Sequence, residues 1–164
     1  NEFTQQGMKS QSPPERQGQI NPPKVPHPFD PYPTQVYFGP LRWRHGRQRL
    51  PQFARVSGDS NPAHMDENYA KTTQFKTRIV HGMLAGSLFS ALLGTDLPGV
   101  GTIYTGQTLK FTRPVHFGEE ITASVTVKEL NAERNRAVFE CLAVNPQGEP
   151  VIIGEATVMP PKAS

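Results

Sequence analysis

Hydrophobic side chains alternate with polar ones over most of the chain after residue 100. This period of two is typical of strands that bury one face. The Asn145-Pro-Gln-Gly148 segment interrupts the alternation and is typical of a turn. We predict four strands in this part of the chain: Thr102–Phe111, Glu120–Leu130, Arg134–Asn145 and Pro150–Met159.

A helix is predicted immediately before these strands, over His81–Gly94, with Gly94 as the C′ residue that ends it. The segment is too apolar to lie on a surface, so we expect the sheet to wrap around it. Two shorter helical segments are predicted earlier, over Leu50–Val56 and Asp66–Ala70. The pattern predicts an α+β fold in which an antiparallel sheet wraps around a central helix.

The first part of the chain has a different composition. Nine of the 17 prolines lie in residues 1–40, which contain few aliphatic side chains that could form a core. X-Pro steps favour extended backbone, so we predict a disordered or irregular Pro-rich arm over residues 1–40. A single domain is predicted over residues 41–164. The short run Val36-Tyr-Phe38 is compatible either with a strand or with docking onto the domain.

Charge is divided in the same way as proline. Residues 1–50 hold 7 Lys and Arg against 3 Asp and Glu, a net +4, whereas residues 51–164 hold 10 against 11, a net −1. A nucleic-acid-binding domain would present a basic face, so the near-neutral body argues against nucleic acid as a partner.

Other features bear on the compartment. No stretch approaches the roughly 20 apolar residues that span a bilayer, and no basic-then-apolar signal opens the sequence. Cys141, the single cysteine, cannot form an internal disulfide. We therefore expect a protein without a membrane partner, in the cytoplasm or, alternatively, in the mitochondrion.

The first candidate catalytic residues lie in the predicted loop Ser57-Gly-Asp-Ser-Asn-Pro-Ala-His64. Asp59 and His64 are five positions apart across a loop shaped by Gly and Pro, and could converge on one small molecule. A water between a carboxylate and an imidazole can lose a proton to one group while the other orients it. The alternative is that Asp59 and Asn61 make only local turn hydrogen bonds.

A second candidate is the predicted helix start, Ile79-Val-His81-Gly82-Met83. Unpaired amides at a helix N-terminus can donate to an oxygen that gains charge, and Gly82 would allow close approach. Alternatively, Gly82 serves tight helix-to-sheet packing, and His81 is more simply explained as structural. Ser90 lies just over two turns after Gly82, on a nearby part of the helix surface.

Taken together, these segments resemble the MaoC-like, R-specific enoyl-CoA hydratases, also called hydratase 2. The resemblance covers residues 53–159. It rests on the following segments: Phe53-Ala-Arg-Val-Ser-Gly-Asp-Ser-Asn-Pro-Ala-His64-Met-Asp66, Ile79-Val-His-Gly-Met-Leu84 through Ser87-Leu-Phe-Ser90 to Leu93-Gly94, Leu97-Pro-Gly-Val-Gly-Thr-Ile-Tyr104, and Phe111-Thr-Arg-Pro-Val115 with Gly118-Glu-Glu120. It implies a hot-dog fold and a homodimer. The family usually has a first strand where this chain has the arm, so either Thr34–Leu41 supplies that strand or the arm is foreign to the domain.

The resemblance also implies a reaction, and roles for individual residues in it. Water adds reversibly to a trans-2-enoyl-CoA to give the (3R)-3-hydroxyacyl-CoA, without a metal or redox cofactor; coenzyme A is part of the substrate. Asp59 and His64 are the implied catalytic pair, Gly82 the oxyanion donor, and Ser90 a neighbour of the substrate. Leu93 and Val158 are candidate walls for the acyl chain, with core packing as the alternative.

Three other functions remain open on the sequence. A dehydratase acting on acyl carrier protein needs the same pair, and basic Arg78, Lys110 and Arg113 would favour that acidic partner. A hot-dog thioesterase needs an acidic residue but not His64. A non-catalytic acyl-binding module needs neither. The sequence leaves acyl chain length open, and also the pathway: polymer supply, β-oxidation or lipid synthesis.

Overall fold

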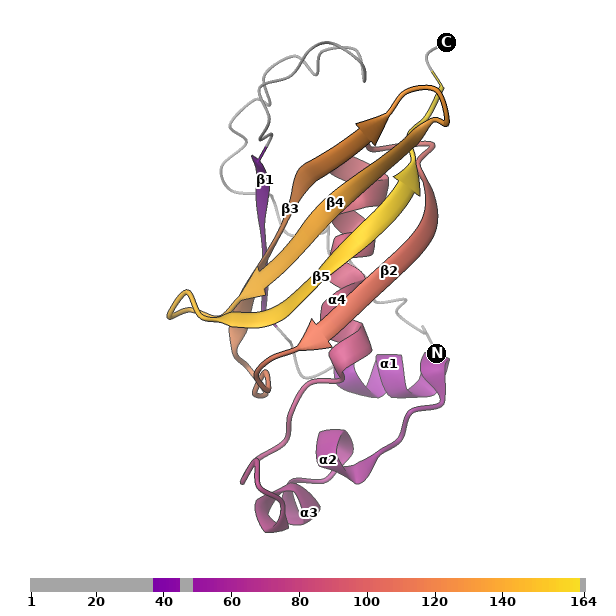
Figure 1. The fold of residues 1–164 in the computed structure, drawn as a ribbon. Coiled ribbons are helices and arrows are strands. Elements are labelled where there is room, and N and C mark those ends of the chain that lie inside the picture. The colour runs from indigo at the N-terminus through magenta and orange to yellow at the C-terminus, as the bar shows by residue number, and fades with distance from the viewer. Residues whose placement is uncertain (1–36, 45–48, 163–164) are drawn as a thin grey trace, which may run out of the picture.

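The computed structural model describes the backbone of residues 37–44 and both backbone and side chains of residues 49–162. Five strands form one antiparallel sheet in the order β1-β3-β4-β5-β2 (Figure 1). The strands are β1 (Tyr37–Arg44), β2 (Ile103–Phe111), β3 (Glu120–Asn131), β4 (Arg136–Val144) and β5 (Pro150–Met159). The four strands predicted from alternation are confirmed, each to within two residues at either end.

Strand β1 supplies an edge of the sheet. It pairs with β3 from Tyr37 opposite Thr126 to Arg44 opposite Glu120. Part of the Thr34–Leu41 segment therefore supplies the first strand. Tyr37 and Phe38, predicted as part of the arm, pair in the sheet, and the register shifts between Phe38 and Leu41. The predicted disorder of the preceding residues lies outside the described part of the chain.

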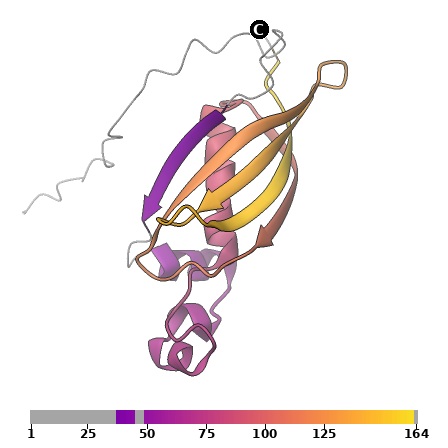
Figure 2. The same cartoon turned by 60° about the vertical axis from the view of Figure 1, so that its left-hand side comes forward.

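Helix α4 (Gly82–Ala91) lies across the concave face of the sheet, as predicted (Figure 2). The predicted end at Gly94 is wrong, because the helix continues as the π-helical segment η1 (Leu92–Asp96). In this wider turn the amide of Leu97 donates to the carbonyl of Leu92 at 2.9 Å. The extra turn keeps Leu92 and Leu93 buried, and this gain in burial outweighs the preference of glycine for ending a helix.

The core lies between α4 and the sheet. Along β4 every second residue is buried, from Ala137 through Phe139 and Cys141 to Ala143. Facing them, α4 and η1 bury a row of apolar side chains: Leu84, Leu88, Phe89, Leu92 and Leu93. Each large side chain removed from water contributes about 1.5–3 kcal/mol, so this contact is the main source of stability. The predicted hot-dog arrangement is confirmed.

Three short helices gather at the N-terminal end of α4 (Figure 1): α1 (Arg49–Ser57), α2 (Pro62–Met65) and α3 (Glu67–Thr72). Leu50 and Ala54, one helical turn apart, are the buried residues of α1. Asp66 caps α3 by accepting hydrogen bonds from the amides of Asn68 and Tyr69. The helices among the described residues are all too short or too polar to cross a membrane.

Candidate active site

The loop between α1 and α2 positions Asp59. Gly58 follows α1 with φ of +79°, a conformation that favours glycine, and its amide donates to the carbonyl of Ala54 at 2.9 Å. The amide of Asp59 donates to the Ser57 hydroxyl at 3.2 Å, and the Asp59 carboxylate accepts from the amide of Asn61 at 3.2 Å. The local turn hydrogen bonds expected from the sequence are therefore present, and they hold the carboxylate in place.

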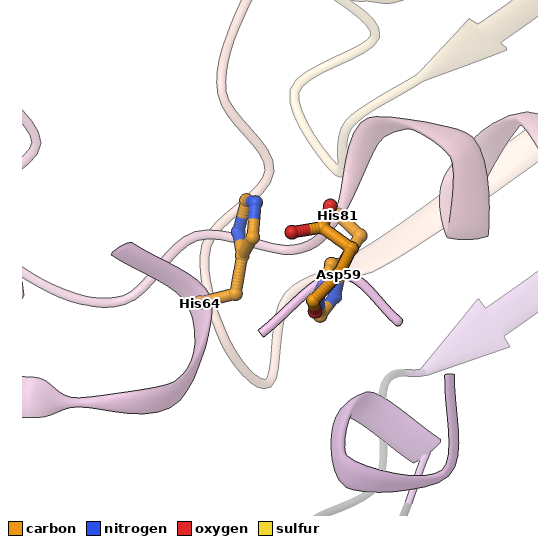
Figure 3. A group of neighbouring side chains, drawn as sticks. All are labelled: Asp59, His64 and His81. Atoms are coloured by element: carbon orange, nitrogen blue, oxygen red, sulfur yellow. The ribbon is translucent and has the colours of Figure 1, made fainter. Parts of the chain in front are cut away.

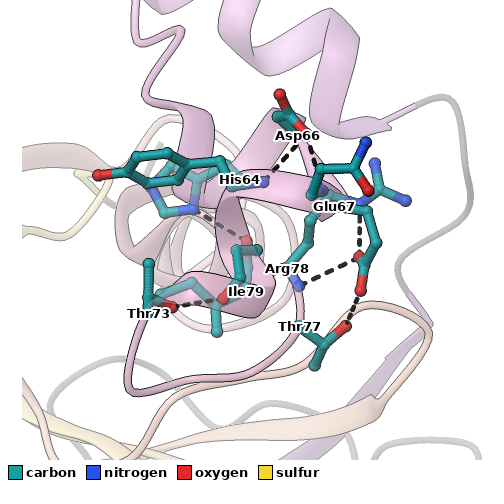
Figure 4. A network of polar contacts seen from close by, with 10 residues as sticks. His64, Asp66, Glu67, Thr73, Thr77, Arg78 and Ile79 are labelled. Carbon is teal, nitrogen blue, oxygen red and sulfur yellow. Dashed lines mark hydrogen bonds and ion pairs between the residues drawn. The ribbon is translucent and has the colours of Figure 1, made fainter.

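His64 lies on α2, whose N-cap is Asn61, with an imidazole oriented by a single backbone group. Its Nδ1 lies 2.9 Å from the carbonyl oxygen of Ile79 (Figure 4). A carbonyl can only accept, so Nδ1 carries the proton of the neutral ring. The lone pair is then on Nε2, which is the nitrogen able to take a proton from water.

Asp59, His64 and His81 come together at the start of α4 (Figure 3). Each offers one potential ligand atom, and these atoms lie within 4.8 Å of one another. The convergence of Asp59 and His64 expected from the loop is therefore present in the fold. Two imidazoles and a carboxylate are also a donor set that could hold a first-row transition metal.

His81 is the third member of this cluster and is 1% exposed. Its Nε2 donates to the backbone carbonyl of Asp59 at 3.0 Å, and its ring centroid lies 4.0 Å from that of His64. Burial lowers the pKa of His81, although the hydrogen bond to the Asp59 carbonyl acts in the opposite direction. His81 is therefore uncharged near neutral pH.

A cavity of about 450 Å³ opens beside this cluster and is lined by Asp59, His64 and Gly82. Its size is within the usual range for small-ligand sites. Most of the remaining wall is apolar, with contributions from Phe75, Ile79, Met83, Phe111, Val115 and Ile152. Phe75 and Phe111 were not predicted as site residues, since both belong to the wall only through tertiary packing.

Gly82 begins α4 and faces the cavity. First-turn amides have no acceptor within their own helix, and the N-cap residue His81 makes no side-chain hydrogen bond to them. A Cβ atom built on Gly82 would lie 2.9 Å from Cε1 of Phe111. The predicted close packing at Gly82 is therefore present, and its predicted role as an oxyanion donor is compatible with it.

The structure does not bring the other predicted site residues to this cavity. Ser90 is exposed and lies eight residues beyond Gly82, which is about 12 Å along a helix axis. Leu93 and Val158 are both 0% exposed and belong to the hydrophobic core. None of the three lines the cavity. Their predicted contacts with a substrate would require a channel that extends further along α4.

Two of the three cations considered for a carrier-protein surface have intramolecular partners. Arg78 pairs with Glu67 at 3.3 Å (Figure 4). Its guanidinium carbon also lies over the ring of Phe117, 4.7 Å from the ring centroid. A hydrogen bond from Thr77 is the main cause that lowers the pKa of Glu67. Arg113 donates to the carbonyl of Pro150 at 2.9 Å and lies 3.5 Å from the carboxylate of Glu149.

Comparison with known proteins identifies related sequences. A family model described as a MaoC like domain matches residues 23–143, beginning within the segment predicted as an arm. An (R)-specific enoyl-CoA hydratase of Rhodospirillum rubrum is 53% identical over 109 residues, 66% of this chain and 75% of the relative. A mitochondrial 3-hydroxyacyl-[acyl-carrier-protein] dehydratase of Arabidopsis thaliana is 37% identical over 112 residues, 66% of each chain.

A solved structure has the same fold. The (R)-hydratase from Aeromonas caviae, described as involved in PHA biosynthesis, superimposes with a TM-score of 0.76 and 41% sequence identity. The match covers 80% of this chain and 98% of the other.

Proposed function

Because this chain belongs to the MaoC-like domain family, we propose that it is an (R)-specific enoyl-CoA hydratase, a hydro-lyase. The reaction is the reversible addition of water to trans-2-enoyl-CoA, giving (3R)-3-hydroxyacyl-CoA. The observation that carries this proposal is the convergence of Asp59 and His64 on a cavity that also contains the start of α4. The names of the hydratases to which the chain is similar support the same substrate class.

The proposed mechanism follows from the two polar groups and the helix start. A water held between Asp59 and His64 loses a proton to Nε2 of His64, and its oxygen bonds to the β-carbon of the enoyl group. The electron pair moves to the thioester oxygen, where the amide of Gly82 stabilises the developing charge. A proton returned to the α-carbon on the same face completes syn addition. One acid–base pair on one side of the substrate can perform both transfers.

The test is a pair of substitutions, His64→Ala and Asp59→Asn. Each should lower kcat by roughly 10²–10⁴ and change KM far less, because the lost interactions act mainly in the transition state. Asp66→Asn is the matched control: it removes a nearby exposed carboxylate but keeps a good N-cap for α3. Unchanged hydration by Asp59→Asn would refute the mechanism, whereas absence of hydration by the unsubstituted chain would favour a non-catalytic acyl-binding protein.

The second candidate function is dehydration of a substrate on acyl carrier protein, which the name of the Arabidopsis relative favours. Against it, Arg78 and Arg113 are paired with Glu67 and Glu149, so these cations offer little net charge to an acidic carrier. We expect higher kcat/KM with crotonyl-CoA than with the carrier-bound enoyl substrate. The reverse order would favour the dehydratase, and thiol release without loss of enoyl absorbance would favour a thioesterase.

A homodimer is part of this proposal. Strand β2 lies at an edge of the sheet, where β5 is its described partner, and it exposes Ile103 (56%), Tyr104 (37%) and Phe111 (48%). An edge strand with exposed apolar side chains is a natural contact for a second copy. Sedimentation equilibrium should give twice the chain mass of 18.2 kDa. A monomer at micromolar concentration would contradict this.

We also propose cytoplasmic location and catalysis without a resident metal or redox cofactor. The burial of Cys141, a free thiol, supports a reducing compartment. Hydration needs only acid–base groups and an oxyanion donor, so activity should survive dialysis against a chelator. Loss of activity that added Zn²⁺ restores would instead favour a metal bound by Asp59, His64 and His81.

A further inference from the structure

His81 connects several parts of the active site, although it does not line the cavity itself. Its side chain is buried and lies at the N-cap of α4, yet it makes no capping hydrogen bond to that helix. The Nε2–H group instead donates to the backbone carbonyl of Asp59, 22 residues earlier, at 3.0 Å. The imidazole is therefore used to tie the catalytic loop to the helix start.

Two other rings lie against this imidazole. The His64 ring lies 4.0 Å away between centroids with an interplanar angle of 34°. The Phe53 ring of α1 lies 5.0 Å away at 57°. These contacts restrict the rotation of His81, and through the stacked ring they restrict His64 as well.

The neighbours of His81 in sequence act on the same reaction centre. Two residues earlier, the carbonyl of Ile79 accepts the Nδ1–H of His64 at 2.9 Å. The next residue, Gly82, begins α4 and faces the cavity. Residues 79–82 therefore orient the imidazole of His64, anchor the loop that carries Asp59, and provide the first amide of α4. Any shift of this segment would change the distance between the acid–base pair and the thioester oxygen.

The choice of histidine is not explained by core packing. Nδ1 of His81 is buried and has no hydrogen-bond partner among the described residues. An unsatisfied buried nitrogen is costly, and an apolar side chain of similar volume would avoid this cost. What an apolar side chain cannot supply is the donor to Asp59. The ionisable groups that face the ring are Asp59 and His64.

We infer that His81 is a positioning residue, which holds Asp59 and His64 in register with the first amide of α4 through its Nε2–H and its stacked ring. The inference rests on the proposed hydration reaction. Displacement of reacting groups by about 1 Å can cost roughly 10²-fold in rate, so loss of this anchor should be visible in kcat.

The test compares three variants of the full chain with crotonyl-CoA as substrate. His81→Phe keeps a stacked ring but removes the donor, and should lower kcat roughly 10- to 100-fold with KM changed less than about threefold. His81→Gln places an amide donor near the position of Nε2 and should restore kcat to within about fivefold of the unsubstituted chain. His81→Asn places its donor near Nδ1 instead and should not restore activity.

A spectroscopic readout separates positioning from loss of structure. Imidazole ¹⁵N resonances should assign the Nδ1–H tautomer to His64 in the unsubstituted chain and in His81→Gln, and a mixture of tautomers in His81→Phe. Full kcat in His81→Phe, or equal kcat in His81→Gln and His81→Asn, would overturn the inference. If His81→Phe fails to fold, the comparison of kcat between His81→Gln and His81→Asn still tests the inference. Failure of the proposed function is recognised separately, by the absence of crotonyl-CoA hydration in the unsubstituted chain.

Discussion

Replacing Gly82 by Ala tests the proposed oxyanion donor with a single methyl group. The added Cβ would lie 2.9 Å from Cε1, 3.0 Å from Cζ and 3.2 Å from Cδ1 of the Phe111 ring. Phe111 is 48% exposed, so its ring can turn away without moving the backbone. Overpacking costs about 1–3 kcal/mol, and alanine recovers up to about 1 kcal/mol as a better helix former. We expect a net loss of stability of at most about 3 kcal/mol.

The expected effect on catalysis is larger. The methyl group and the displaced ring would occupy the space in front of the first-turn amides, where the thioester oxygen is proposed to bind. Loss of one oxyanion donor typically lowers kcat by roughly 10²–10³, equivalent to about 3–4 kcal/mol of transition-state stabilisation. The assay is hydration of crotonyl-CoA, followed by the loss of enoyl thioester absorbance, together with a thermal unfolding curve for the same sample.

Gly86→Ala is the matched control for this experiment. A Cβ at Gly86 would lie 2.9 Å from Cδ1 of Leu109, which is an equally close approach on the same helix. Gly86 does not line the cavity, so its substitution should lower stability with little change in kcat. If Gly82→Ala retains full kcat, the oxyanion assignment is refuted. If both variants lose activity equally, displacement of α4 is the cause.

The remaining predictions concern the sheet and the single thiol. Gly154→Ala should lower the free energy of unfolding by about 3 kcal/mol or more, since its Cβ would lie 1.9 Å from the carbonyl oxygen of Thr108 and would separate β2 from β5. Gly106→Ala should change it by less than about 1 kcal/mol, because its nearest contact is an ordinary 3.8 Å; equal effects in calorimetry would contradict the packing. Cys141 is 3% exposed, and burial raises the pKa of its thiol from 9.0 to about 11, so a disulfide reagent at pH 8 should label it only after denaturation. As the pH rises, the thiol ionises at a lower pH in the unfolded chain than in the folded protein. The stability contributed by the buried thiol should therefore fall between pH 9.0 and about 11, and a Cys141→Ala variant should lack this decline.

Some features of the fold depend mainly on local pattern and could be predicted from the sequence. Strands β2 to β5 were predicted closely from the alternation of hydrophobic and polar residues. In β4 this alternation matches the burial of every second residue, whereas β2 has no fully buried residue. The helix start was predicted for a similar reason, since the apolar run begins at His81–Gly82. Its end was not, because whether η1 continues past Gly94 depends on the burial of Leu92 and Leu93 against the sheet.

The features of the site also differ in whether the sequence alone could predict them. The sequence by itself determined that Asp59 and His64 lie five positions apart across a segment shaped by Gly and Pro, and that a glycine opens the central helix. Only the tertiary structure decided which nitrogen of His64 carries the proton and what holds Asp59, since those contacts come from Ile79 and His81, 15 and 22 residues away. It also separated Ser90, Leu93 and Val158 from the cavity. Local patterns record which side chains are buried, whereas the alignment of one group with another depends on backbone that the chain brings together only by folding.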